Sequence, residues 1–255
     1  MRRFTEPYGD DPRQFGEWFI PDVDNPPLVV LVHGGYWRPV WRLDIEEASA
    51  LALAEAGFAV WSLEYRTYEH PWPTTMLDVG AGIDQGVREA ARHGIDTSRR
   101  ALLGHSAGGG LALWAASRRS MSHDAPGADP EAPAFDIVIC HAPVSCLAVG
   151  SRDRLGEGAI DTFMGGRPED VPERYAACDP GAHLPFVGSR LVLLHGDADE
   201  DVPLAQSQTY LAHLREHGQD AELVVLPGQG HYEILDPSSS VSHLRRDLLA
   251  RALLA

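Results

Sequence analysis

A serine, an acid and a histidine stand in the sequence where together they could carry out nucleophilic catalysis. Ser106 lies in the run GHSAGG. The pattern G-x-S-x-G places a serine on a sharp bend between a strand and a helix, with its hydroxyl exposed. An apolar stretch over 100–104 precedes the run and an Ala/Leu-rich stretch over 107–118 follows it. This context predicts the strand and the helix, and it makes Ser106 the candidate nucleophile.

The candidate base is His231, in the run LPGQGHYEIL. It follows an expected strand over 223–226, and a loop there can carry an imidazole over the carboxyl edge of a parallel sheet, where catalytic groups gather. The loop HGDADEDVP offers the acid. Asp197, Asp199 and Asp201 could each accept the imidazole N–H and fix its tautomer, and spacing alone does not choose among them.

The run LVVLVHGGYW supplies a further part of the expected site. Backbone N–H groups of Gly35 and Tyr36, with that of Ala107 directly after the serine, are expected to form an oxyanion hole. Glycine allows such a loop to approach a substrate closely. One donor of this kind typically contributes about 3 to 4 kcal/mol to transition-state stabilisation.

Large aromatic side chains gather in the loops expected at the same edge: Tyr36, Trp37, Trp41, Trp72, Phe163 and Phe186. Any one of them is more simply explained as part of the core beneath a long loop. As a group they favour an apolar or aromatic pocket for the acyl or leaving group. We predict that Trp37, Trp72 and Phe163 line that pocket.

Composition excludes several other functions. The formal charge of −16 argues against nucleic acid and anionic membrane surfaces as partners. The chain has no lysine, which excludes a Schiff-base lysine, a Walker lysine and a Ser-Lys dyad. The cysteines, Cys140, Cys146 and Cys178, lack metal-ligand spacing. We therefore expect neither a metal nor a cofactor, and a small molecule as the partner.

Cysteine usage and apolar runs bear on the compartment. Three irregularly spaced cysteines fit a reducing environment better than a disulfide framework. The start MRRFTEPYGDDPRQ lacks the apolar segment of a signal peptide, and no apolar run approaches the roughly 20 residues of a membrane span. These features favour a cytoplasmic location. They leave the oligomeric state open, a homodimer among the options.

Strand-like and helix-like segments alternate along the 255 residues, which predicts an α/β protein with a mostly parallel sheet and helices on both faces. The expected strands are 15–20, 28–33, 58–63, 100–104, 135–140, 190–195 and 223–226. The expected helices are 44–56, 74–93, 107–118, 204–217 and 242–254. The pattern breaks over 143–185, rich in Gly, Pro and charge. We interpret this stretch as a cap-like insertion over the active site of a single domain, 1–255.

Taken together, these motifs resemble the α/β-hydrolase superfamily across nearly the whole chain, in which the triad order is Ser, acid, His. Within it, HGGYW, GHSAGG, HGDADEDVP and GQGHYEIL look like kynurenine formamidases (arylformamidases) and related bacterial carboxylesterases. The insertion piece FMGGRPEDVPERYAACDP resembles the same branch. The acid-loop pattern of that branch assigns the catalytic acid to Asp199.

A second resemblance concerns a single segment. The segment from Glu64 to Pro73 is similar to the DYRLAPEHPFP segment of hormone-sensitive-lipase-like esterases. The chain departs from that group in having HGGY in place of HGGG, His105 where an acidic residue usually precedes the serine, and the acid loop H-G-x-x-D-x-x-V-P. These departures favour the formamidase and esterase branch.

The resemblance implies a cofactor-independent serine hydrolase of small carboxylic esters or N-aryl formamides, acting through Ser106, Asp199 and His231 and an acyl-enzyme. The competing hypothesis is a non-catalytic member of the fold that binds a small molecule. A binding module would be free to lose the serine or the histidine. Because both are present, we favour the enzyme.

Overall fold

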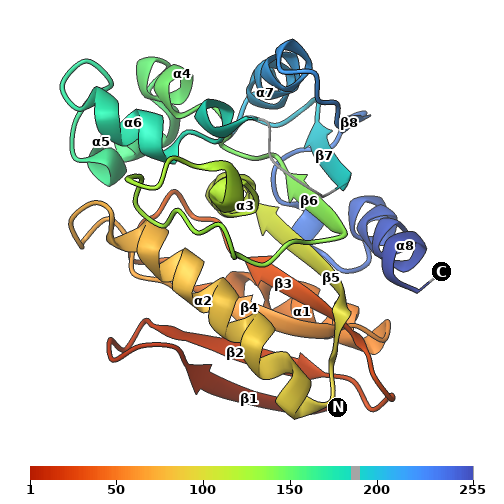
Figure 1. The fold of residues 1–255 in the computed structure, drawn as a ribbon. Coiled ribbons are helices and arrows are strands. Elements are labelled where there is room, and N and C mark those ends of the chain that lie inside the picture. Colours follow the sequence, from red (N-terminus) through yellow and green to blue (C-terminus); the bar gives the residue numbers. More distant parts are fainter. Residues whose placement is uncertain (185–189, 255) are drawn as a thin grey trace.

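The structure is a computed structural model that describes residues 1–184 and 190–254. Within these residues, eight strands form one sheet in the order β1-β2-β4-β3-β5-β6-β7-β8 (Figure 1). The strands are β1 (Arg2–Pro7), β2 (Phe15–Ile20), β3 (Pro27–Val32), β4 (Ala59–Leu63), β5 (Asp96–His105), β6 (Ile137–His141), β7 (Arg190–Gly196) and β8 (Glu222–Leu226).

The sheet is parallel over most of its width. β2 pairs antiparallel with β1 and with β4, whereas every pairing from β4 to β8 is parallel. The carboxyl ends of β3, β5, β6, β7 and β8 therefore meet at one edge. The candidate residues of the sequence follow these strands, so the topology brings the loops that carry them together.

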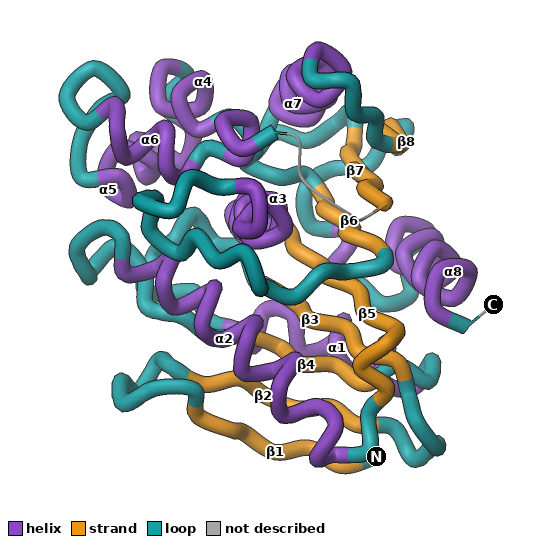
Figure 2. The backbone as a smooth tube through the Cα atoms, in the orientation of Figure 1, coloured by secondary structure: helices purple, strands orange, loops and turns teal. Residues whose placement is uncertain are grey.

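Helices cover both faces of the sheet (Figure 2). α1 (Glu47–Glu55) and α8 (Ser240–Leu253) pack on one face, and α2 (Thr74–Ala90), α3 (Ala107–Ser117) and α7 (Ala205–Glu216) on the other. Successive strand residues feed the two layers alternately, as the period of a strand requires. Val30 and Val32 belong to the α2/α3 side, and Val29 and Leu31 to the α1/α8 side.

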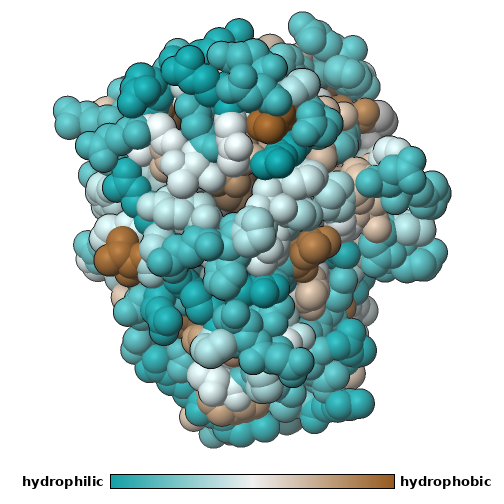
Figure 3. All heavy atoms as spheres, turned by 90° about the vertical axis from the view of Figure 1, so that its left-hand side faces the viewer, coloured by the Kyte–Doolittle hydropathy of each residue, from teal (hydrophilic) through white to brown (hydrophobic). Residues whose placement is uncertain are grey.

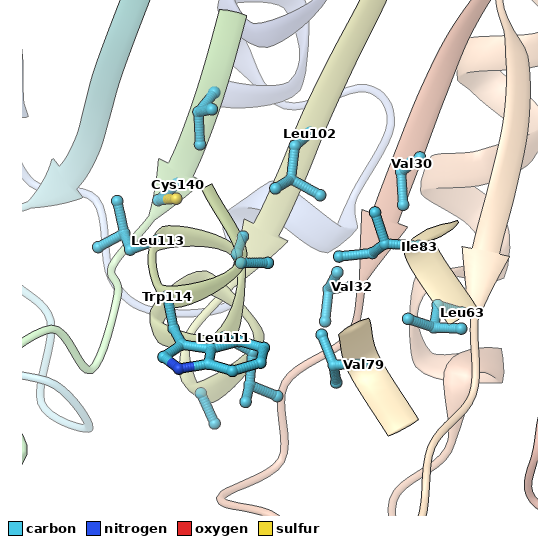
Figure 4. Packing of buried hydrophobic residues seen from close by; sticks show 14 of the residues in the cluster. Val30, Val32, Leu63, Val79, Ile83, Leu102, Leu111, Leu113, Trp114 and Cys140 are labelled. Carbon is cyan, nitrogen blue, oxygen red and sulfur yellow. The ribbon is translucent and has the colours of Figure 1, made fainter. Parts of the chain in front are cut away.

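Figure 4 shows the α2/α3 side of this core from nearby. Ile83 of α2 lies beside the strand side chains Val30 and Val32, and Val79 of α2 lies beside Val32, while Trp114 of α3 belongs to the same cluster. All five are almost fully buried. This packing anchors α3, which begins directly after the candidate nucleophile.

Three short helices, α4 (Leu147–Arg152), α5 (Ala159–Met164) and α6 (Pro172–Cys178), lie between β6 and β7. The 3₁₀ turn η4 (Leu155–Gly158) lies between α4 and α5, and a second one, η5 (Pro180–His183), follows α6. In Figure 1 the helices cluster at the upper left, the side toward which the arrowheads of β5 and β6 point. The irregular stretch of the sequence thus forms a small helical layer near the carboxyl edge.

Candidate active site

Ser106 occupies a strained backbone position between β5 and α3. Its φ of 59° and ψ of −124° lie outside the regions that non-glycine residues usually adopt. Its N–H donates to the carbonyl of His141, 2.9 Å away, and its carbonyl accepts the N–H of Val144 at 3.1 Å. Strain of this kind persists where surrounding contacts enforce it, and it concentrates at functional sites.

Two glycines make this bend sterically feasible. A Cβ atom on Gly104 would lie 2.3 Å from the carbonyl oxygen of Gly108, and a Cβ atom on Gly108 would lie 2.3 Å from the carbonyl oxygen of His33. Such distances are too short for any side chain. The glycines of the G-x-S-x-G pattern therefore let α3 begin tight against β5 and β3.

The side chains of Asp199 and His231 contact each other. Nδ1 of His231 lies 2.7 Å from Oδ2 of Asp199, and both side chains are buried. The other carboxylate oxygen, Oδ1, accepts the N–H groups of Asp201 and Val202 at 2.9 and 2.8 Å. Burial opposes ionisation of Asp199, but the hydrogen bonds from His231 and these amides lower its pKa, so the group is a carboxylate.

The other two acids of the same loop serve different contacts. Oδ1 of Asp197 accepts the N–H of Gly228 at 2.6 Å, and Oδ1 of Asp201 accepts the hydroxyl of Tyr232 at 3.0 Å. Within residues 1–184 and 190–254, neither of these two carboxylates forms a hydrogen bond or an ion pair with the imidazole of His231. Of the three aspartates, Asp199 is thus the one whose carboxylate contacts the imidazole of His231.

The loop after β3 turns through three successive left-handed positions. Gly35, Tyr36 and Trp37 have φ values of 110°, 50° and 54°. Gly34 lies so close to the serine bend that a Cβ atom there would stand 2.7 Å from the carbonyl oxygen of His105. Gly35 and Tyr36 line the same cavity as Ser106. The two backbone segments expected to form an oxyanion hole are therefore adjacent.

A buried ionic cluster supports this loop from below. Glu64 lies 2.8 Å from the guanidinium of Arg13 and 3.4 Å from Nε2 of His33, and it accepts the N–H of Leu43. Although burial opposes the charged form, the contacts with His33 and Arg13 lower the pKa of Glu64 to about 2. The ring of His33 stacks on Tyr65 with centroids 4.4 Å apart, so the base of the loop is fixed.

A cavity of about 600 Å³ opens above Ser106 and His231. Its walls are formed by Gly35, Tyr36, Arg38, Trp41, Ile45, His105, Gly156, Glu157, Glu200, Asp201, Tyr232 and Leu235. Tyr36 donates its hydroxyl to the carbonyl of Asp201, and Arg38 donates to the carbonyl of Gly156 at 2.8 Å. These bonds connect the loop after β3 with the acid loop and with η4, and so they set the width of the cavity.

The rim of the cavity combines aromatic and charged side chains. Trp41 is 45% exposed and Tyr232 is 59% exposed, which is unusual for such large rings. Arg38, Glu157 and Glu200 also face the cavity. Figure 3 shows the molecule from the left-hand side of Figure 1: the face is hydrophilic over most of its area, with a few separate hydrophobic side chains.

The three aromatic residues expected to line the pocket lie elsewhere. Trp37 and Phe163 are buried and stack on each other, with centroids 4.2 Å apart and planes 3° from parallel. Trp72 donates its indole N–H to Sγ of Cys178. None of the three is among the residues that line the cavity. The prediction that these three residues line the pocket is therefore corrected: the left-handed turn at Tyr36 directs Trp37 into the core. Phe186 lies outside the described residues.

Two members of the aromatic group singled out in the sequence, Tyr36 and Trp41, line the cavity, but sequence reasoning missed other wall residues. Arg38 follows the HGGYW run directly, and Tyr232 directly follows His231. Their proximity in sequence to the motif residues was the available signal. His105 also lines the cavity, although the sequence singled it out only as a departure from another esterase group.

Residues 1–184 and 190–254 hold no group of three His, Cys, Asp or Glu side chains arranged to bind a metal ion. None of the helices described there has the length and apolar character that crossing a membrane requires.

Comparison with curated proteins gives distant relatives. Esterase LipC of Mycobacterium tuberculosis is 26% identical over 239 residues, which cover 90% of this chain and 59% of that protein. The chain thus spans less than two thirds of the length of this relative.

Comparison with solved structures gives the fold. A truncated carbohydrate esterase from gut microbiota has a TM-score of 0.82 at 20% identity, over 99% of this chain and 96% of that one. Esterase B from Lactobacillus rhamnosis has a TM-score of 0.83 at 19% identity, over 98% and 86%. These likenesses show the α/β-hydrolase fold. A family model described as BD-FAE matches residues 20–214, most of the sequence, and the chain therefore belongs to the BD-FAE family.

Proposed function

We propose that the protein is a serine hydrolase of small carboxylic esters, with Ser106 as nucleophile, His231 as general base and Asp199 as the acid that orients His231. The observation that carries the proposal is the 2.7 Å bond between Asp199 and His231 at the cavity that Ser106 also lines. The name of the relative LipC, an esterase, supports the same reaction class.

In the first half of the reaction, Nε2 of His231 takes the hydroxyl proton of Ser106 while Oγ bonds to the ester carbonyl carbon. The imidazolium that forms is stabilised by the ionised Asp199. Negative charge develops on the carbonyl oxygen, where the N–H groups of Gly35, Tyr36 and Ala107 are proposed to bind it. Ala107 is the first residue of α3, so the positive end of the helix dipole favours the same charge.

Collapse of this intermediate breaks the bond between the carbonyl carbon and the leaving oxygen. His231 gives its proton to that oxygen, and an alcohol departs. Water then attacks the acyl-enzyme, with His231 again accepting a proton and returning it to Ser106. The products are a carboxylic acid and an alcohol, and no cofactor enters the balance.

The cavity wall favours a substrate with a short acyl group and a flat aryl group. Tyr36, Trp41 and Tyr232 offer ring faces on which an aryl group can pack. The bonds from Tyr36 to Asp201 and from Arg38 to Gly156 close the cavity on two sides. We propose that residues 143–185 act as a cap that bounds the site, and that an acyl part of about one to four carbons fits.

The decisive experiment is hydrolysis of p-nitrophenyl esters by the wild type and by Ser106→Ala. We expect the wild type to cleave the acetate or butyrate faster than the palmitate. Ser106→Ala should retain the fold by circular dichroism and lose at least roughly 10³-fold in kcat. Near-normal turnover by this variant would contradict the assignment of the nucleophile. A faster rate on the palmitate would contradict the enclosed cavity.

N-aryl formamides are a second candidate substrate, suggested by the aromatic rim and by the formamidase resemblance of the motifs. The amide is the harder substrate, because His231 must protonate a poor nitrogen leaving group. N-formylkynurenine should be cleaved by the wild type and not by Ser106→Ala. Rapid ester turnover with no cleavage of N-formylkynurenine would leave only the esterase.

A further inference from the structure

The histidine that precedes the nucleophile contacts the candidate base. His105 is 3% exposed, and the centroid of its ring lies 4.6 Å from that of His231. Nε2 of His105 is 2.9 Å from the backbone carbonyl oxygen of His231. A carbonyl oxygen only accepts, so Nε2 must carry the hydrogen in this contact.

We propose that His105 is a positioning residue for His231: it holds the backbone of the candidate base at a fixed distance from the neighbouring nucleophile. The inference rests on the proposed function and extends it to a residue outside the triad. Asp199 fixes the ring of His231 through Nδ1, whereas His105 fixes the main chain from which that ring projects.

The loop that carries His231 needs such a restraint. It contains Gly228, at a φ of 70°, and Gly230, and glycine lowers the resistance of a backbone to movement. Contacts with the acid loop hold its first part: Gly228 donates to Asp197, and the carbonyl of Gln229 accepts the N–H of Ala198 at 3.1 Å. The bond from His105 reaches His231 itself.

The hydrogen bond from His105 to His231 also affects the distance between Ser106 and His231, because His105 directly precedes Ser106 in the chain. His105 is the last residue of β5 and is joined by one peptide bond to Ser106. The hydrogen bond therefore connects the backbone of the nucleophile with that of the base. A displacement of about 1 Å between reacting groups can cost about 10²-fold in rate.

The surroundings of His105 keep its ring neutral. Burial, together with the nearby charge that His231 acquires, lowers the pKa of His105 to about 3. Oε1 of Glu46 lies 3.7 Å from Nδ1, and burial raises the pKa of Glu46. His141 packs with its ring centroid 5.3 Å away, and burial lowers its pKa too. A neutral ring supplies the donor without repelling the imidazolium that forms on His231.

Three variants separate positioning from simple packing. His105→Phe keeps a planar ring and removes the donor. His105→Gln places an amide N–H near the position of Nε2 and can restore the bond. His93→Phe is the matched control, because His93 is a partly buried histidine that packs on Phe4 and Trp18 of β1 and β2.

The measurements are kcat and KM on p-nitrophenyl acetate, with thermal unfolding of each variant. We expect His105→Phe to lower kcat by about 10²-fold with little change in KM, His105→Gln to recover most of the loss, and His93→Phe to match the wild type. Wild-type kcat in a folded His105→Phe would overturn the proposal. Equal impairment of His105→Gln and His105→Phe, with both folded, would also overturn it.

A spectroscopic test uses the wild type and does not depend on turnover. The ¹⁵N shifts of the ring should show His105 as a neutral Nε2–H tautomer that does not titrate between about pH 5 and 8. A ring that protonates in this range, or an Nδ1–H tautomer, would contradict the bond to His231. Absence of ester hydrolysis by the wild type would instead contradict the proposed function, so the two failures are distinguishable.

Discussion

Asp199 and His231 are 32 positions apart in the sequence, yet Oδ2 of the aspartate lies 2.7 Å from Nδ1 of the histidine. Their strands, β7 and β8, are parallel neighbours in the sheet, so the two loops leave the same edge side by side. The backbone N–H groups of Asp201 and Val202 hold the second oxygen of Asp199. These two hydrogen bonds fix the orientation of the carboxylate.

Replacement of Asp199 by Asn should abolish most of the activity. The amide would keep the shape but favour the wrong tautomer of His231 and could not stabilise the imidazolium, a loss of about 10⁴-fold in kcat in such triads. Steady-state kinetics on p-nitrophenyl acetate measure the effect.

Asp201→Asn is the matched control for that loss. The side chain of Asp201 accepts the hydroxyl of Tyr232 on the exposed rim, and an amide oxygen can accept the same bond. We expect kcat close to that of the wild type. An inactive Asp201→Asn beside an active Asp199→Asn would transfer the role of the acid to Asp201.

Motif context placed Ser106, His231 and the acid loop at the carboxyl edge, because each follows an expected strand. In the structure Ser106 and the acid loop follow the buried ends of β5 and β7, and His231 follows the partly exposed edge strand β8. The pocket could not be derived in the same way. Whether Trp37 or Trp41 faces the cavity depends on the left-handed turn at Tyr36 and Trp37, and that turn is enforced by packing against β5 and η4. The conformational preferences of neighbouring residues do not predict contacts with elements that are distant in the sequence.

Trp41→Ala and Phe163→Ala should have opposite consequences. Trp41 lines the cavity and is half exposed, so its loss should raise KM for aryl esters by about three- to tenfold and leave stability nearly unchanged. Phe163 is buried against Trp37, so its loss should lower the free energy of unfolding by about 3 to 5 kcal/mol. Kinetics and urea unfolding on both variants measure the contrast.

The reverse pattern would show that Phe163 lines the pocket and contradict the assignment made here. In that pattern Trp41→Ala loses stability, and a stable Phe163→Ala has a raised KM. Equal KM values for aryl and alkyl esters in the wild type and Trp41→Ala would show that the ring of Trp41 makes no contact with the substrate.

Glu64→Gln should lower the free energy of unfolding most at neutral pH. The pKa of Glu64 is about 2 in the folded protein and about 4.3 when unfolded, so the unfolded state binds more protons between these values. The stabilisation by Glu64 is complete above about pH 4.3 and disappears as the pH falls toward 2. Urea unfolding midpoints at pH 7, 4 and 3 should therefore show a difference from the wild type that shrinks with acidity.

Glu173→Gln provides the comparison, because its side chain is 70% exposed and its contact with Arg174 is at 3.9 Å. Its unfolding midpoint should follow that of the wild type at each pH. A wild-type to Glu64→Gln difference that grew as the pH fell would contradict the assignment of an ionised Glu64.

The fold was predictable over most of the chain because its buried parallel strands are continuous apolar runs. β2 and β7 begin where the sequence predicts. β1 was missed: RRFTEP has only one strongly apolar residue, and five of its six residues would fit a loop equally well. It is a strand because β2 offers it an antiparallel edge, a tertiary contact that local pattern does not contain.

The central claim, that Ser106 is a nucleophile activated by His231, is tested most directly by covalent labelling. A fluorophosphonate probe should add one label to the wild type, and peptide mass mapping should place it on Ser106. Ser106→Ala should take up none, and His231→Ala should react far more slowly, because the hydroxyl then lacks its base. A wild type that stays unlabelled, or that carries the label on another residue while Ser106→Ala labels equally well, would contradict the account.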